Sequence, residues 1–269
     1  MEKNILLNRV FLVLLALAFT FSTGRLIDKK SFANSQIFTD FPLKQAKPGD
    51  DYANGIHILL AKHQADHEDT HYLLELFRWN RMAANNGSLI AQYKLGVMYR
   101  DGLGTLRDYE KAAEWFERSA DQGHEFAQYN LGVMYRDGIG VSQNYAKALA
   151  LFFLSSEQGN AAAKYNIGAM YHFGKGVKQN HETAFEWYFR GAEQGDEDSQ
   201  YNLGWMYATG QGVRQDKVNA YMWLDILAAK GDPQATQLRD AFGKGMTASE
   251  IVQSEQLARE CELKNYKDC

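Results

Sequence analysis

Residues 95–99 read Leu-Gly-Val-Met-Tyr, and a close copy of this stretch recurs three times at a fixed interval. The copies are Leu131–Tyr135, Ile167–Tyr171 and Leu203–Tyr207, each with glycine second, methionine fourth and tyrosine fifth. Working outward, every copy is followed by a Gly-x-Gly, then an alanine and a closing glycine at matching positions. The interval is 36 residues, and a period of this length is typical of repeat architectures. We expect four units, at residues 88–123, 124–159, 160–195 and 196–231.

Each unit has the residue pattern of two helices. Leu95 and Met98 share one face of a first helix, where Gly96 leaves room for a neighbouring helix to approach the backbone. Gly102 and Gly104 supply the positive φ angles that end this helix, and a second helix follows. One pair alone leaves apolar stripes exposed, and stacking of pairs buries them. The sequence predicts an all-α fold, a right-handed α-solenoid of antiparallel helix pairs.

The units resemble Sel1-like repeats, which are relatives of the tetratricopeptide repeat. The resemblance rests on A-x-x-x-L-G-x-x-Y, on G-x-G and on K-A-x-x-W-[FY], which is Lys111–Phe116 in the first unit. It covers residues 88–231 and implies the same solenoid. Later units depart from the pattern at a few positions, with Ser199 in place of Ala, Leu151 in place of Trp, and Thr183 and Asn219 in place of Lys.

Both ends of the array are predicted to be caps. One period before Trp115 and Gly123 stand Trp79 and Gly87, so residues 52–87 are expected to form a degenerate first unit. Residues 232–269 are expected to form a C-terminal capping helix and tail. In this segment Thr247-Ala248-Ser249-Glu250 has the spacing of a capping box, which opens a helix.

The N-terminal residues predict export. A basic start, a short apolar run and small residues before position 25 resemble a secretory signal peptide, so we assign residues 1–24 to it and 25–51 to an extended lead. The alternative is an uncleaved anchor, which would be the chain's membrane contact. We expect a periplasmic or secreted protein. In an oxidising compartment Cys261 and Cys269 can form a disulfide, with two free thiols as the alternative.

Composition excludes several classes of protein. Hydrophobic residues make up 45% and charged residues 23%, which is typical of a folded domain rather than a disordered chain. A net charge of −4 disfavours nucleic-acid binding, because phosphate contacts need a basic surface. No Ser/His/Asp arrangement or phosphate-binding motif is present, so we expect neither enzymatic activity nor a cofactor.

One polar stretch outside the repeats carries three histidines. On a helix His63, His67 and His71 would share one face, at a spacing that can ligate zinc or nickel. The register of the degenerate unit ends its first helix near residue 63, which separates them. We therefore favour a solvated segment over a metal site.

Candidate partner-binding residues lie on the first helices. By similarity to tetratricopeptide geometry, several positions of each first helix would face the concave side. One of these positions is tyrosine in every unit, and the others vary between units. Arg100, Arg136, His172 and Trp205 stand out because the repeat pattern does not require them, whereas the tyrosines can equally be packing residues. The candidate set is Tyr93, Arg100, Tyr129, Arg136, Tyr165, His172, Tyr201 and Trp205.

These observations predict an exported, non-catalytic scaffold that presents a concave groove to a protein or peptide partner. Two alternatives remain open. One is a cell-envelope carbohydrate- or peptidoglycan-binding protein or enzyme that uses the aromatic faces. The other is a metal-binding protein that uses His63, His67 and His71.

Overall fold

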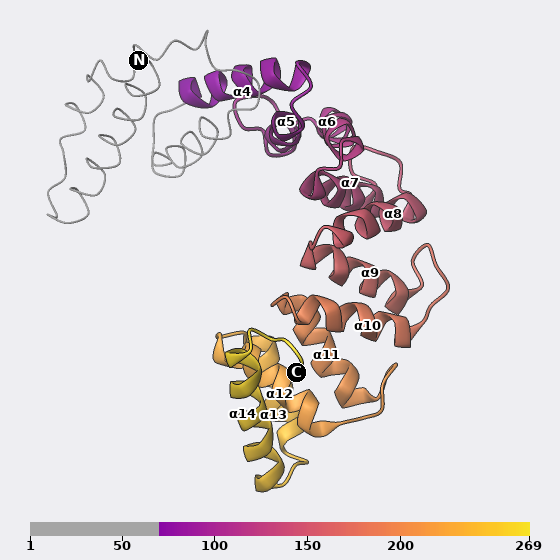
Figure 1. The fold of residues 1–269 in the computed structure, drawn as a ribbon, viewed down its shortest axis with the longest axis vertical. Helices are drawn as coiled ribbons and strands as arrows, with labels where there is room; N and C mark the ends of the chain where they lie inside the picture. The colour runs from indigo at the N-terminus through magenta and orange to yellow at the C-terminus, as the bar shows by residue number, and fades with distance from the viewer. Residues whose placement is uncertain (1–69) are drawn as a thin grey trace, which may run out of the picture. The chain divides into compact units, whose positions relative to one another are not determined.

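The computed structural model describes residues 70–269, and within them the chain forms eleven helices and no strands. The predicted signal peptide (1–24), the lead (25–51) and the histidines at 63 and 67 lie outside the described residues. The helices follow one another in chain order (Figure 1). They are α4 (Thr70–Asn85), α5 (Leu89–Asp101), α6 (Tyr109–Asp121), α7 (Glu125–Asp137), α8 (Tyr145–Glu157), α9 (Ala161–Phe173), α10 (His181–Ala192), α11 (Glu197–Thr209), α12 (Lys217–Ala229), α13 (Pro233–Gly243) and α14 (Ala248–Leu263).

The expected solenoid of helix pairs is confirmed. The pairs are α5 with α6, α7 with α8, α9 with α10 and α11 with α12, and the second helix of each pair packs against the first helix of the next. Before them α4 provides a second helix without a described partner of its own, and it buries Phe77 and Ala84 against α5. The core is therefore a series of clusters along the stack, each shared by two to four helices.

Local sequence sets both ends of each helix. The side chain before every first helix accepts a hydrogen bond from the third backbone N–H of that helix, and Asp or Asn does the same before every second helix. Each first helix ends on a glycine in the left-handed conformation. These caps fix the helix lengths, so equivalent residues occupy equivalent places in all four units.

Two glycines of each unit are required by close contacts. A Cβ on Gly132 would lie 2.8 Å from the ring of Phe152, so this glycine lets the two helices of the pair approach each other. Gly140 has φ +70°, and a Cβ there would lie 2.3 Å from the carbonyl oxygen of Tyr109. The turn of one unit therefore rests directly on the backbone at the start of α6, the second helix of the preceding unit.

Buried polar side chains tie the helices together at recurring places. Within the first unit, the Gln122 amide donates to the Gln92 side-chain oxygen at 2.6 Å, and the Gln92 amide donates to the Ala84 carbonyl of α4 at 3.2 Å. The second unit repeats both bonds, with Gln158 donating to Gln128 and Gln128 donating back to α6. The third unit has Lys164 at the position of Gln92 and Gln128.

Ser199 departs from the repeat pattern, and a second departure nearby makes room for its side chain. Its side chain is buried at a position that is alanine in the other units. A Cβ on Gly191 would lie 2.3 Å from the Ser199 hydroxyl oxygen, and the equivalent residues of the first two units are Ser119 and Ser155. The glycine therefore makes the room that the larger side chain needs.

The C-terminal segment holds one helix more than the sequence predicted. Asp232 caps α13 with Pro233 in its first turn, and α13 packs on α12 as a first helix of a further unit would. The predicted capping box of Thr247 and Glu250 is confirmed at the start of α14. That helix also packs on α12.

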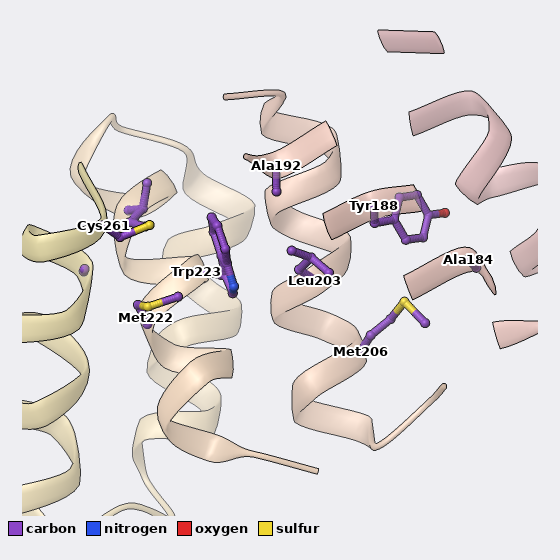
Figure 2. Packing of buried hydrophobic residues seen from close by; sticks show 10 residues of the cluster. Ala184, Tyr188, Ala192, Leu203, Met206, Met222, Trp223 and Cys261 are labelled. Carbon is purple, nitrogen blue, oxygen red and sulfur yellow. The ribbon is translucent and has the colours of Figure 1, made fainter. Parts of the chain in front are cut away.

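A disulfide joins Cys261 of α14 to the last residue, Cys269. Cys261 is buried in one cluster with Met222 and Trp223 of α12, and Figure 2 shows it on the opposite side of the Trp223 ring from Leu203. The short loop closed by the disulfide places the ring of Tyr266 against Gly195 and below the ammonium group of Lys230, which lies 5.0 Å from the ring centroid.

Alanine at Gly140 is expected to destabilise the protein much more than alanine at Gly159. Both residues have positive φ, which costs a non-glycine residue about 1–2 kcal/mol. Gly159 has no atom within 4 Å of an added Cβ, whereas Gly140 meets the Tyr109 backbone, so Gly140→Ala should cost about 3 kcal/mol in total. Urea unfolding of the two variants measures the difference. Equal losses would show that the turn does not need this contact.

Candidate functional site

The four candidate tyrosines lie half-buried on the first helices, each next to the second helix of its own unit. Tyr93 is tilted against Phe116, with ring centroids 5.9 Å apart. Tyr129 and Phe152 repeat this contact at 5.9 Å, and Tyr165 and Tyr188 at 5.8 Å. The tyrosines therefore contribute to packing within each unit. Their remaining surface recurs at one position of each first helix, and we call this set the tyrosine row: Tyr93, Tyr129, Tyr165 and Tyr201.

Acidic side chains of α11 approach this row from later units. Burial raises the pKa of the Tyr129 hydroxyl, Arg136 opposes this, and the carboxylates of Asp196 and Asp198 raise it further. Burial also raises the pKa of Tyr165, with Asp198 and Asp196 the next largest causes. Asp196 and Asp198 lie two units beyond Tyr129. An electrostatic effect from residues two units away is consistent with the predicted concave side of the first helices, which we call the inner face.

The two candidate arginines have a role that the sequence interpretation missed. The Arg100 guanidinium donates to the Asn130 side-chain oxygen at 2.6 Å, and it also binds its neighbour Asp101 at 2.7 Å. Arg136 likewise donates to the Asn166 side-chain oxygen in the next unit. It also forms an ion pair with Asp137, at a distance of 2.7 Å. Each arginine therefore joins its unit to the next, although the later units form the same helix pairs with His172 and Ala208 at this position.

His172 occupies the place of these arginines in the third unit. Its ring lies 4.9 Å from that of His181, at the start of α10, and the Nδ1 atoms of both rings are buried without a hydrogen-bond partner. Burial lowers the pKa of His172, and the neighbouring His181 lowers it further. Protonation of His172 would therefore place a positive charge in partly buried surroundings beside a second histidine, which the folded structure disfavours.

Trp205 is the candidate residue with the most open aromatic surface. It lies on α11 with 38% of its surface exposed, and the equivalent residues of the other units are Val97, Val133 and Ala169. Tyr201, on the same helix, contacts the small cluster of Leu224, Leu227 and Ala235. The structure thus places an exposed indole on the same first helix as Tyr201, the last tyrosine of the row.

Other kinds of site find little support in the part of the chain that the structure describes. Within residues 70–269 no group of three or more His, Cys, Asp or Glu side chains is placed to hold a metal ion. Of the three predicted histidines, His71 lies in the first turn of α4, and the other two lie outside the described range. None of the described helices has the length and apolar character that crossing a bilayer requires.

Comparison with known proteins identifies the class of fold. The family model of the Sel1 repeat matches residues 89–124, 126–160, 161–196 and 197–232, which is more than half of the chain. The chain therefore belongs to the Sel1 repeat family. The matched segments follow the periodic glycines almost residue for residue.

Among solved structures, a Sel1 repeat protein from Oxalobacter formigenes is similar along most of its length. It is 29% identical, with a TM-score of 0.67, and the match covers 83% of this chain and 92% of that one. The protective antigen c5321 of uropathogenic Escherichia coli, described as displaying an SLR fold, is 25% identical, with a TM-score of 0.40 and coverage of 81% and 62%. A comparison with curated protein sequences gives no match.

The histidine pair predicts that stability falls in mild acid. The folded pKa of His172 lies below the unfolded value of about 6.5, so the unfolded chain binds this proton more readily. Its contribution to stability is therefore complete above about pH 6.5 and is lost as the pH falls through the folded pKa. Burial also lowers the pKa of His124, which adds to the same trend.

Urea unfolding between about pH 7.5 and pH 5.5 measures this loss, and the slope should be smaller in His172→Gln than in wild type. The His124 contribution remains in the variant, so some slope should persist. Identical slopes in the two proteins would contradict the assignment to His172.

Proposed function

We propose that this protein is an exported, non-catalytic scaffold that binds a segment of a partner protein on the inner face of its first helices. The observation that carries the proposal is the tyrosine row, with Trp205 on the helix of its last tyrosine and with Asp196 and Asp198 near the row. Tyrosine and tryptophan provide large contact areas at low cost in conformational entropy, and they are enriched where proteins bind one another. Sel1 repeats generally serve as protein-interaction modules, which supports the same function.

The acidic side chains favour a partner segment with basic residues. Asp198 is exposed, and no ion pair engages it in the described structure. A lysine or arginine side chain could pair with this carboxylate while its stem lies on Tyr129 or Tyr165. Export rests on the signal-like segment of residues 1–24. The Cys261–Cys269 disulfide is consistent with it, since disulfides persist in oxidising compartments.

The test is a proximity-labelling capture in the native cell, after fractionation has placed the protein. Trp205→Ala should weaken the partner's affinity about thirtyfold, as expected for removal of a large aromatic contact residue. Arg136→Ala is unsuitable because it also breaks the bond to Asn166. Leu106→Ala serves as the control, since Leu106 is 88% exposed in the connection between α5 and α6.

A partner captured by wild type and by the control, and lost with Trp205→Ala, would support the scaffold. The same capture by all three would show that the inner face is not the binding surface. Sedimentation of the purified chain with cell-wall material, with no captured protein, would favour the carbohydrate-binding alternative. Recovery of the protein in the cytoplasm would overturn export.

A further inference from the structure

The outward positions of the second helices differ in character between units. Two positions one turn apart are exposed in α6, α8 and α10 but covered in α12. The residues are Glu114 and Arg118 in α6, Ala150 and Leu154 in α8, Glu186 and Arg190 in α10, and Met222 and Ile226 in α12. In α12 both are 1% exposed, because α14 packs over this face, whereas Leu154 of α8 is 49% exposed. The outward face of α8 is thus apolar like the covered face of α12, and it is open.

The contact between α12 and α14 shows what kind of segment fits such a face. The Lys217 ammonium group donates to the Gly245 carbonyl at 3.0 Å, which sets the starts of the two helices side by side. At their far ends Lys230 lies over the ring of Tyr266. The two helices therefore run parallel. Small buried residues of α14, including Ala258 and Cys261, join a cluster with the large side chains of α12.

An open hollow lies at the matching place beside the end of α8. Its lining includes Gly123 and Gln158, which stand two repeat periods before Gly195 and Lys230. Those two later residues are the ones that Tyr266 contacts after the end of α14. The hollow is completed by Leu89, Gln122, His124, Glu125 and Phe126. Open space beside a left-handed glycine is therefore present two units earlier, with Gln158 in place of Lys230, together with the apolar helix face that leads to it.

We propose that the outward face of α8 and this hollow, together called the α8 face, bind an amphipathic helix of a partner protein. The face comprises Ala146, Ala150, Leu151 and Leu154 with the hollow at Gly123 and Gln158. The bound helix runs parallel to α8 and is followed by an aromatic residue that enters the hollow. The helical part of the site lies on the second helix α8, away from the proposed binding face of the first helices. The hollow includes residues at the start of α7, and two of its residues, His124 and Phe126, contact Tyr93 of the tyrosine row.

The side chains of the α8 face are smaller than those of α12, and this difference determines which residues a partner helix needs. The α8 face has Ala150 and Leu151 where α12 has Met222 and Trp223. A helix with the small residues of α14 would leave gaps there, and unfilled gaps forfeit packing energy. The partner helix must therefore carry larger aliphatic residues where α14 has Ala258 and Cys261. The same difference excludes such a helix from the α12 face, where the large residues of α12 already fill the space.

The test uses a synthetic peptide of residues 247–269 with its disulfide closed and with Ala258→Leu, labelled with a fluorophore. Anisotropy titration with the intact chain should show saturable binding that is tighter than that of the unsubstituted peptide. Leu154→Glu in the protein should weaken it at least about tenfold, because a carboxylate would be buried against apolar side chains. Leu106→Glu is the matched control and should leave binding unchanged, since Leu106 is 88% exposed in a turn.

Hydrogen exchange of the complex should show new protection in α8 and not in α12, and circular dichroism should confirm that both variants remain folded. Saturable binding that Leu154→Glu abolishes supports the proposal. The absence of saturable binding, or binding insensitive to Leu154→Glu, overturns it. Tyr266→Ala in the peptide should weaken binding, and an unchanged affinity would overturn the aromatic half of the proposal. A dimer of the free protein that Leu154→Glu dissociates would assign the face to a second copy instead.

Discussion

The contact between the second glycine of each turn and the backbone of the preceding unit is the constraint on which the array depends. The Tyr109 carbonyl lies where a side chain of residue 140 would be, and the His181 carbonyl stands in the same relation to Gly212. An inserted or deleted residue in this turn would lift one unit off the other. The fixed interval of 36 residues between units agrees with this close approach, while the caps set the helix lengths. A buried departure such as Ser199 is accompanied by a compensating change at Gly191.

Local patterns were sufficient to predict the helix pairs, because their causes lie within a few residues. The left-handed glycines, the N-cap side chains and the capping box of Thr247 and Glu250 each act over one turn. The roles of Arg100 and Arg136 could not be predicted in this way. Each bonds to an asparagine thirty residues later, across a second helix and a turn, and only stacking brings the two together. The start of α13 could have been predicted from Asp232 and Pro233.

The tyrosine row could be predicted from the sequence better than the α8 face, because local patterns predict positions within a unit but not contacts between units. The tyrosine row follows from the repeat register, since one position recurs in every unit. The approach of Asp196 and Asp198 to Tyr129 depends on how far successive units rotate, which sequence spacing does not reveal. The character of the α8 face is visible in the sequence as Ala150 and Leu154 among glutamates and arginines. Its meaning becomes clear only beside α12, where α14 shows what such a face accepts.

The side-chain hydrogen bonds that join one unit to the next, here called polar ties, have a mechanical consequence. The first and second units are held by two of them, the bond from Arg100 to Asn130 and the bond from Gln128 to the Ala120 carbonyl. On entry to the third unit Lys164 replaces the glutamine, and on exit His172 replaces the arginine. One tie of the two remains at each of these junctions, from Arg136 and from Gln200 respectively. A solenoid stretched from its ends, or opened by thermal fluctuation, would therefore yield first around α9 and α10, and the two ends of the array would move apart as separate arms.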